Sequence, residues 1–105
     1  MTSAFQPWAV VPVYDHEHAI GTTLDRLLPH RVPVLLVDDG SVASCAAVLR
    51  ELASRHAGQV SLLRLEQNGG KGAAVIAGMR QAAVLGASHV LQIDADGQHD
   101  TADVP

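Results

Sequence analysis

Four short, mainly apolar runs alternate along this chain with three segments whose apolar residues recur at helical spacing. The runs are Trp8–Val13, Val34–Val37, Val60–Leu65 and His89–Ile93. Short apolar runs bounded by polar turns are typical of strands that are buried on both faces of a sheet. Strands that alternate with helices predict an α/β fold, in which four mainly parallel strands are joined by three right-handed helical crossovers.

The three intervening segments carry their apolar side chains on one face, as helices do. These residues are Ile20, Leu24, Leu27 and Leu28 in the first segment, Cys45, Val48, Leu49, Leu52 and Ala53 in the second, and Ala74, Gly78 and Ala82 in the third, Lys71–Leu85. We expect the first helix to stop near Pro29 and the third, with its small residues, to lie close against the sheet. Pro12 is expected at the exposed end of the first strand, because proline cannot donate a ladder hydrogen bond.

Polar residues gather directly after each predicted strand. The clusters are Tyr14-Asp15-His16, Asp38-Asp39, Asn68 to Lys71, and Asp94 to Asp100. The carboxyl ends of parallel strands share one edge of a sheet, and open α/β sheets bind their ligands at that edge. Residues that are far apart in the sequence are therefore predicted to form one site.

The composition limits the class of protein. A chain of 105 residues is enough for one domain, and a hydrophobic fraction of 48% supports a packed core. The formal charge of −4, without a basic run, lacks the pattern expected of a nucleic-acid-binding surface. Cys45 is a single cysteine, and the sequence shows neither a signal peptide nor a span of about 20 apolar residues. We therefore expect a cytoplasmic protein, with any membrane role peripheral.

Asp94-Ala95-Asp96 places two carboxylates directly after the fourth predicted strand, and Gln98 adds an amide oxygen. Two carboxylates at close range repel each other, and a divalent cation relieves that repulsion. Oxygen ligands favour Mg²⁺ or Mn²⁺, which usually bridge to a substrate phosphate. The pattern predicts a metal site made by Asp94, Asp96 and Gln98. A solvated turn rich in Asp and Gly is the alternative, and the position after a strand favours the metal.

Two further clusters fit a ligand. One of the adjacent acids Asp38 and Asp39 can accept a hydrogen bond from a nucleoside base or ribose, the other being structural, while Ser41 or Ser44 fits a helix cap. Asn68-Gly69-Gly70-Lys71-Gly72 is a glycine-rich entry into a helix and suits the approach of an anion. It matches neither a P-loop nor a dinucleotide motif, and Lys71 fits a phosphate contact or a surface charge equally well.

Together these clusters resemble the motifs of family 2 glycosyltransferases, in particular the dolichyl-phosphate mannose synthase-like branch. The matching stretches are Val11-Pro12-Val13-Tyr14, Leu36 to Ser41, Asn68 to Gly72 with Gly78, and Gln92 to His99. They cover nearly the whole chain in the family's order. The resemblance implies a Rossmann-like GT-A fold that binds a nucleoside diphosphate sugar with a divalent metal. Residues 1–105 would form the N-terminal, nucleotide-sugar-binding part of that domain.

The resemblance also implies roles for individual residues. The implied donor pocket consists of Pro12, Tyr14, Val37, Asp39, Lys71, Asp94 and Ala95. Within it, Pro12 and Tyr14 line the base and ribose pocket, Asp39 contacts the nucleoside, and Asp94 faces the ribose and the diphosphate. The metal would lie on the diphosphate. The implied acceptor is a polyprenyl phosphate or another lipid-linked molecule, which places the protein at the inner face of the membrane.

Two features depart from the family pattern. Members of this branch often carry Asn-Glu after the tyrosine, where this chain has Asp15-His16. The chain also stops at Pro105, before the acceptor-binding half in which inverting members place their catalytic base. We therefore expect a fragment that holds a donor and whose catalytic base lies beyond Pro105.

Two other interpretations fit parts of the sequence, and a third, an EF-hand calcium loop, does not fit. Asp94-Ala95-Asp96-Gly97 also resembles the nucleophile motif of haloacid-dehalogenase-type phosphatases. That motif normally follows the first strand and has Thr or Val in place of Gln98. An EF-hand calcium loop requires glycine at its sixth position, whereas Gly97 would be the fourth residue. A donor-binding remnant without turnover is the second interpretation that fits.

Overall fold

The computed structural model describes residues 5–15 and 18–95. The elements are β1 (Pro7–Val13), α1 (Ile20–Leu27), a short 3₁₀ helix η1 (Leu28–His30), β2 (Val34–Asp39), α2 (Ala43–Arg55), β3 (Val60–Leu65), α3 (Lys71–Val84) and β4 (His89–Gln92). The predicted alternation of strands and α-helices is confirmed, and α1 ends just before Pro29, which lies in η1. Within the described ranges, no helix is long and apolar enough to cross a lipid bilayer.

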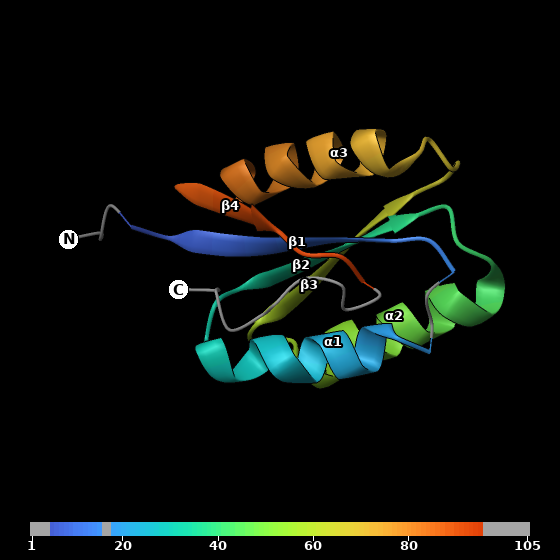
Figure 1. The fold of residues 1–105 in the computed structure, drawn as a ribbon, viewed down its shortest axis with the longest axis horizontal. Helices are drawn as coiled ribbons and strands as arrows, with labels where there is room; N and C mark the ends of the chain where they lie inside the picture. Colours follow the sequence, from blue (N-terminus) through green and yellow to red (C-terminus); the bar gives the residue numbers. More distant parts are fainter. Residues whose placement is uncertain (1–4, 16–17, 96–105) are drawn as a thin grey trace.

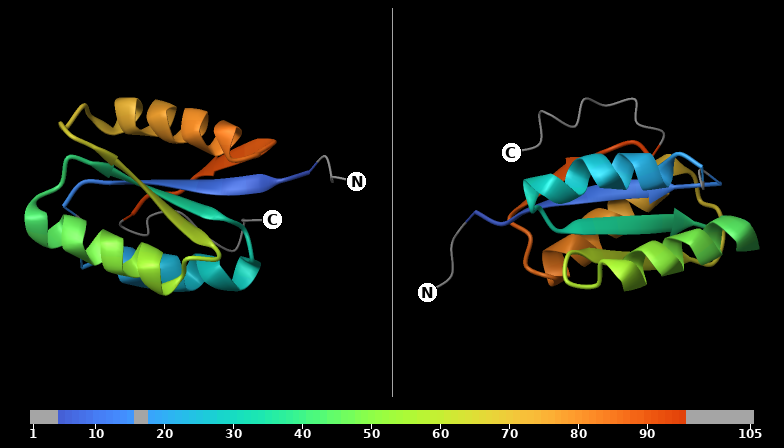
Figure 2. Two further views of the ribbon diagram at one scale, coloured as in Figure 1. Left: turned by 180° about the vertical axis from the view of Figure 1, so that it is seen from behind. Right: turned by 90° about the horizontal axis from the view of Figure 1, so that it is seen from below.

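The strands form one parallel sheet in the order β3-β2-β1-β4. Helices α1 and α2 cover one face of this sheet, and α3 covers the other (Figure 1, Figure 2). All three helices begin on the same side of the molecule, at the right in Figure 1. The carboxyl ends of the strands and the N-terminal ends of the helices therefore meet at one edge.

The core lies on both faces of the two central strands. Ala9, Val11 and Val13 of β1 pack with α1 and α2, whereas Val10 packs beneath α3. Every residue of β2 is buried as well. Because strands covered on both faces need apolar side chains in both directions, the sequence of these strands shows continuous apolar runs rather than alternation.

Pro12 is buried, which contradicts the prediction that it marks an exposed strand end. The main-chain groups of alternate residues in a strand point to opposite neighbours. Val10 accepts a hydrogen bond from the Ile93 N–H at 3.0 Å, so Val10 faces β4, and so does Pro12 two residues further on. The pairing with β4 ends at Gln92, opposite Val10. An N–H at position 12 would point to β4 beyond the end of the β1–β4 pairing and would have no ladder partner. The central strand β1 therefore tolerates proline there.

Gly78 marks the closest approach of α3 to the sheet. A Cβ atom at this position would lie 2.5 Å from Val10 Cγ1 and 2.8 Å from Val37 Cγ2. Both distances are far shorter than van der Waals contact. Ala74 and Ala82, one turn before and after Gly78, are fully buried. The predicted close packing of the small-residue face of α3 is confirmed.

We expect Gly78→Ala to lower the free energy of unfolding by about 1–2 kcal/mol. Overpacking a core costs about 1–3 kcal/mol, and replacing glycine by alanine in a helix recovers at most about 1 kcal/mol. Gly21→Ala is the matched control, because a Cβ at Gly21 in α1 meets nothing within 4 Å and should not destabilise the fold. Urea denaturation measures both variants, and equal stabilities would contradict the proposed packing.

Candidate functional site

The polar residues that follow the strands meet at the carboxyl edge, as the sequence predicts. The structure brings Asp39 against the β3–α3 connection and Lys71 against Asp94. Tyr14 is 47% exposed at the same edge. Pro12, Val37 and Ala95, which were also predicted to line a donor pocket, are buried. They lie beneath the edge and support the residues that follow them.

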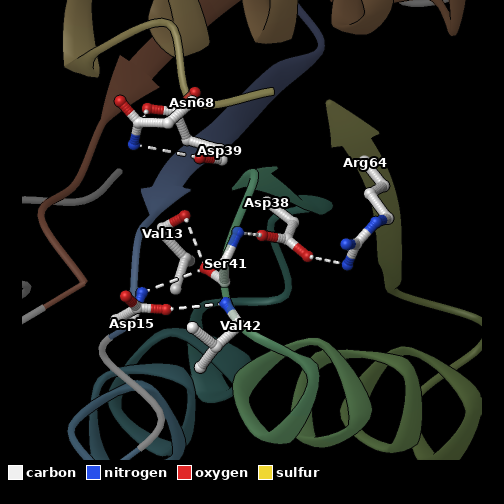
Figure 3. Close-up of polar contacts among 8 residues, drawn as sticks. All are labelled: Val13, Asp15, Asp38, Asp39, Ser41, Val42, Arg64 and Asn68. Carbon is white, nitrogen blue, oxygen red and sulfur yellow. Dashed lines mark hydrogen bonds and ion pairs between the residues drawn. The ribbon is translucent and has the colours of Figure 1, made fainter. Parts of the chain in front are cut away.

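Asp38 has a structural role at the end of β2. Its carboxylate is fully buried, and Oδ1 accepts a hydrogen bond from the Ser41 N–H at 2.8 Å. Oδ2 accepts a hydrogen bond from Arg64 Nη1 of β3, also at 2.8 Å (Figure 3). The buried charge is thus paired and hydrogen-bonded, as a carboxylate in a core must be. Asp38 shapes the turn after β2. Of the two adjacent acids, it is therefore the one with the structural role that the sequence predicts.

Asp39 holds the β3–α3 connection against the end of β2. Oδ1 accepts a hydrogen bond from the Gly69 N–H at 2.9 Å, and Asn68 Nδ2 donates to Oδ2 at 3.2 Å and to the Asp39 carbonyl oxygen at 3.1 Å. Gly40, with φ of +75°, allows this approach, because a Cβ there would lie 2.6 Å from Asn68 N. Asp39 is only 3% exposed. A ligand contact from its carboxylate would use the lone pairs that remain on its oxygens.

Asp15 joins the end of β1 to the start of α2. It has φ of +56°, a left-handed conformation that aspartate and asparagine tolerate better than other non-glycine residues. Its Oδ1 accepts a hydrogen bond from the Val42 N–H at 2.8 Å, and Val42 is the residue that precedes α2. The side chain of the N-cap residue Val42 makes no capping hydrogen bond, but the Asp15 carboxylate accepts the Val42 N–H, as the acidic residue of a capping box does, and lies near the positive end of the helix dipole. This contact is called the Asp15 cap. Members of the family that this chain resembles often have Asn here. Like Asn, Asp15 tolerates the left-handed backbone conformation and can accept the Val42 N–H.

Ser41 supports this contact. The sequence offered Ser41 or Ser44 as the cap of this helix, whereas the N-cap position is Val42. The Ser41 Oγ accepts a hydrogen bond from the Asp15 N–H at 3.0 Å and donates to the Val13 carbonyl oxygen at 3.4 Å (Figure 3). The sequence missed Asp15 as the cap because it precedes Val42 by 27 residues. Caps are usually sought within four residues of a helix start, so no local pattern identifies this one.

Lys71 and Asp94 form an ion pair between the first residue of α3 and the segment that follows β4. Lys71 Nζ contacts Asp94 Oδ1, and the Lys71 side chain is 56% exposed, whereas that of Asp94 is 14% exposed. A positive group therefore already lies at the Asp94 carboxylate. This arrangement is compatible with a cation at Asp94, as the metal prediction requires.

The other predicted metal ligands, Asp96 and Gln98, lie outside the described residues. Across residues 5–15 and 18–95, no three His, Cys, Asp or Glu side chains gather in a way that could hold a metal ion. Of the predicted set, the structure therefore places only Asp94. The metal site as a whole remains a prediction from the sequence.

The start of α3 is suited to an anion. Gly70, with φ of +91°, precedes the helix, and its position has no side-chain cap. Cβ atoms added at Gly70 and at Gly72 would meet none of the described residues within 4 Å, so these residues leave the space beside this backbone open. The first N–H groups of a helix attract negative charge, and Lys71 adds a full positive charge beside them. The start of α2, by contrast, already has the Asp15 carboxylate.

The sequence model of Glycosyl transferase family 2 matches residues 8–105. The chain belongs to glycosyl transferase family 2. The family assignment suggested by the four motifs is thus confirmed, and it disfavours the phosphatase interpretation of Asp94-Ala95-Asp96-Gly97.

The names of two relatives contain lipid phosphates. The UDP-N-acetylglucosamine--dolichyl-phosphate N-acetylglucosaminyltransferase of Methanococcus voltae is 30% identical over 109 residues, which cover 92% of this chain and 43% of the relative. The undecaprenyl-phosphate 4-deoxy-4-formamido-L-arabinose transferase of Pseudomonas savastanoi pv. phaseolicola is 33% identical over 102 residues, which cover 91% of this chain and 29% of the relative. The chain thus spans less than half the length of these relatives.

A solved structure shares the fold. The mannosyltransferase PcManGT from Pyrobaculum calidifontis, solved in complex with GDP-Man and Mn²⁺, is similar with a TM-score of 0.72. The similarity covers 87% of this chain and 27% of that chain, at 23% sequence identity. The predicted GT-A type of α/β fold, with four parallel strands and three helices, is confirmed.

We expect Asp15→Ala to lower the free energy of unfolding by about 0.5–2 kcal/mol, the range for losing a side-chain acceptor at a helix N-terminus. The variant removes the acceptor of the Val42 N–H and leaves alanine in a left-handed conformation. Asp15→Asn should stay within about 0.5 kcal/mol of the unsubstituted chain, because asparagine caps helices as well as aspartate does. Urea denaturation compares the two variants. If asparagine costs as much as alanine, the cap does not stabilise the fold.

Proposed function

We propose that this chain is the donor-binding part of a glycosyltransferase that transfers a sugar from a nucleoside diphosphate sugar to a lipid-linked acceptor, such as a polyprenyl phosphate. Membership of glycosyl transferase family 2 supports the transferase activity. Dolichyl phosphate and undecaprenyl phosphate in the names of two relatives support the acceptor class. Such an acceptor would bring the protein into peripheral contact with a membrane on its cytoplasmic side.

The observation that carries the proposal is the Lys71–Asp94 pair at the open start of α3, on the same edge as Asp39. A nucleoside diphosphate has a neutral part that forms hydrogen bonds and an anionic part. Asp39 and the exposed Tyr14 would contact the base and the ribose. The Lys71 ammonium and the N–H groups at the start of α3 would attract the diphosphate.

The proposal includes a Mg²⁺ or Mn²⁺ ion held by Asp94, Asp96 and Gln98. The oxygen ligands of this set are those that both ions prefer. The ion pair between Lys71 and Asp94 supports the proposal only to the extent that a positive group lies at this carboxylate. When bound, the ion would neutralise charge on the departing nucleoside diphosphate. The described residues would orient the donor, and none of them is assigned as the catalytic base.

Removing the metal should weaken nucleotide binding. Coupling between two ligands is usually in the range of about 5-fold to 150-fold, so we expect the affinity for UDP or GDP to fall by that factor when Mn²⁺ is replaced by a chelator. Asp96→Ala should abolish this difference, because the second carboxylate of the motif is lost. Isothermal titration calorimetry of each nucleotide, in Mn²⁺ and in chelator, measures both effects.

Asp25→Ala is the control for that experiment, because Asp25 is an exposed acid on α1 and should keep the full metal dependence. Nucleotide binding that is equally strong in chelator and in Mn²⁺ would contradict the metal role. The absence of binding for both UDP and GDP, by a chain that is folded by circular dichroism, would contradict the proposed donor site.

Lys71→Met should shift two affinities in opposite directions. Loss of the ammonium should weaken nucleoside diphosphate binding by roughly twofold to fivefold, a modest effect because Lys71 is more than half exposed. Binding of Mn²⁺ without nucleotide should strengthen, because Asp94 loses a competing positive group. Arg80→Met is the control, since it removes an exposed charge from the same helix about 14 Å further along its axis. If Lys71→Met and Arg80→Met change the nucleotide and Mn²⁺ affinities equally, Lys71 has no local role at the site.

A further inference from the structure

Helix α3 presents apolar side chains to solvent as well as to the sheet. Its small residues face the sheet, whereas Ile76, Met79 and Val84 are 52%, 47% and 79% exposed. These three residues share one face of the helix, because they stand three and eight positions apart from Ile76. A surface helix normally turns its apolar side chains to the core and its polar side chains to solvent. A helix that is apolar on both sides is typical of one that is covered on both.

The opposite face of the sheet has a different surface. Helices α1 and α2 present charged residues of both signs to solvent, which are Asp25, Arg26, Arg50, Glu51 and Arg55. Within the described ranges, no large apolar side chain of α1 or α2 is exposed. Figure 1 shows α3 on the other side of the sheet from these two helices. The exposed apolar side chains of the helices thus belong to the α3 side.

The charge on the α3 side suits an anionic partner. None of the 11 acidic residues of the chain lies between Gln67 and Ile93, a stretch that contains α3 and β4. The same stretch contains the basic residues Lys71 and Arg80. The chain as a whole has a formal charge of −4. Positive charge is therefore concentrated here against the overall sign of the molecule.

Arg80 lies among the exposed apolar residues, directly after Met79 and one turn after Ile76. Its side chain has no ion-pair partner among residues 5–15 and 18–95. A protein that covered Ile76 and Met79 would have to bury this charge or supply an acid for it. A lipid surface offers phosphates at the headgroup level, where an arginine can keep its charge while apolar neighbours enter more deeply. The combination favours a lipid surface.

The length of α3 fits a position along a membrane. The helix has 14 residues and so extends about 21 Å, whereas the hydrocarbon core of a bilayer is about 30 Å thick. It begins with Lys71 at the carboxyl edge, where the donor site is proposed. A helix that lies in the membrane surface would keep this edge close to a lipid phosphate in the same membrane.

We propose that the outer face of α3, formed by Ile76, Met79, Arg80 and Val84, binds the surface of a membrane that contains anionic lipids. The three apolar side chains enter the boundary between headgroups and acyl chains, and Arg80 contacts lipid phosphates. The inference rests on the proposed function for its purpose, because a lipid-linked acceptor requires the protein at a membrane. The binding itself needs neither nucleotide nor metal.

The test measures how the chain partitions onto vesicles in a sedimentation assay. Binding to vesicles of phosphatidylglycerol and phosphatidylcholine should be about fivefold or more stronger than binding to phosphatidylcholine alone. Changing both Ile76→Ser and Met79→Ser should weaken binding to the anionic vesicles by about tenfold or more, because both side chains lose apolar surface. The matched control, Ile76→Leu with Met79→Leu, keeps that surface and should bind like the unsubstituted chain.

Arg80→Gln tests the charge. A basic residue near an anionic surface contributes a factor of about five to binding, so this variant should lose about that factor on anionic vesicles and nothing on phosphatidylcholine. Arg50→Gln removes an exposed charge from α2 and is the control, which should bind like the unsubstituted chain. Equal losses in the two variants would indicate an effect of net charge alone and would overturn the assignment to α3.

A fluorescent label locates the contact. An environment-sensitive dye on Val84→Cys should shift its emission to shorter wavelength when anionic vesicles are added, because that position enters an apolar surrounding. The same dye on Ser54→Cys, an exposed position of α2, should not shift. The natural Cys45 is buried and so is shielded from the dye. A shift at position 54 without one at position 84 contradicts the proposed face.

Circular dichroism first establishes that each variant is folded, and Ile76→Ser alone replaces the double variant if that one is not. Absence of binding to anionic vesicles, or binding that the α3 variants leave unchanged, overturns the inference. Self-association that the serine variants abolish, without vesicle binding, identifies a second copy as the partner and also overturns it. These results leave the proposed function intact if the chain still binds UDP or GDP. Vesicle binding through α3 by a chain that binds neither nucleotide supports the inference and contradicts the donor site.

Discussion

The two central strands, β1 and β2, are hydrogen-bonded on both sides and covered by helices on both faces. Such strands have no room for unsatisfied polar side chains along their length, so polar residues appear where the strands end. Parallel pairing places all these ends at one edge of the sheet. The same topology brings the positive ends of the helices to that edge. The burial of the core therefore produces one edge of the sheet at which carboxylates lie beside helix ends that attract anions.

The acids at this edge have different tasks, and the kind of partner that each carboxylate holds separates them. Asp38 and Asp39 are almost completely shielded, and their oxygens hold main-chain N–H groups, Arg64 and Asn68. Asp15 holds the start of α2 in the same way. Asp94 differs, because its partner Lys71 is a mobile type of side chain that is largely exposed to solvent. A long, exposed side chain can leave a carboxylate at little cost, whereas a fixed backbone N–H cannot.

The sequence predicts the fold well because the spacing of apolar residues along a strand or helix can be seen within a few neighbouring residues. The spacing of apolar residues predicts the strands, the helices and the close packing at Gly78. Parallel pairing of the strands predicts that Asp39, Lys71 and Asp94 gather at one edge. The exposed end predicted for Pro12 is wrong, because the length of β4 decides whether the missing N–H matters. The Asp15 cap joins residues 27 positions apart, and the hydrogen bond from Thr23 Oγ1 to the Ala95 carbonyl oxygen joins residues 72 positions apart. No local pattern in the sequence encodes either contact. Asp96 and Gln98 stay predictions.

The position of β1 has a consequence for the order in which the molecule can be assembled during synthesis. Of these four strands β1 leaves the ribosome first, yet it lies between β2 and β4, and Trp8 pairs with Val90, more than 80 residues later. Until β4 emerges, one side of β1 presents unpaired main-chain groups that invite incorrect pairing with other chains. The contacts of Val10, Lys71 and Thr23 with residues 93–95 wait for the same moment. A nascent chain can therefore build most of its hydrophobic core well before it has a completed edge with which to hold a nucleotide.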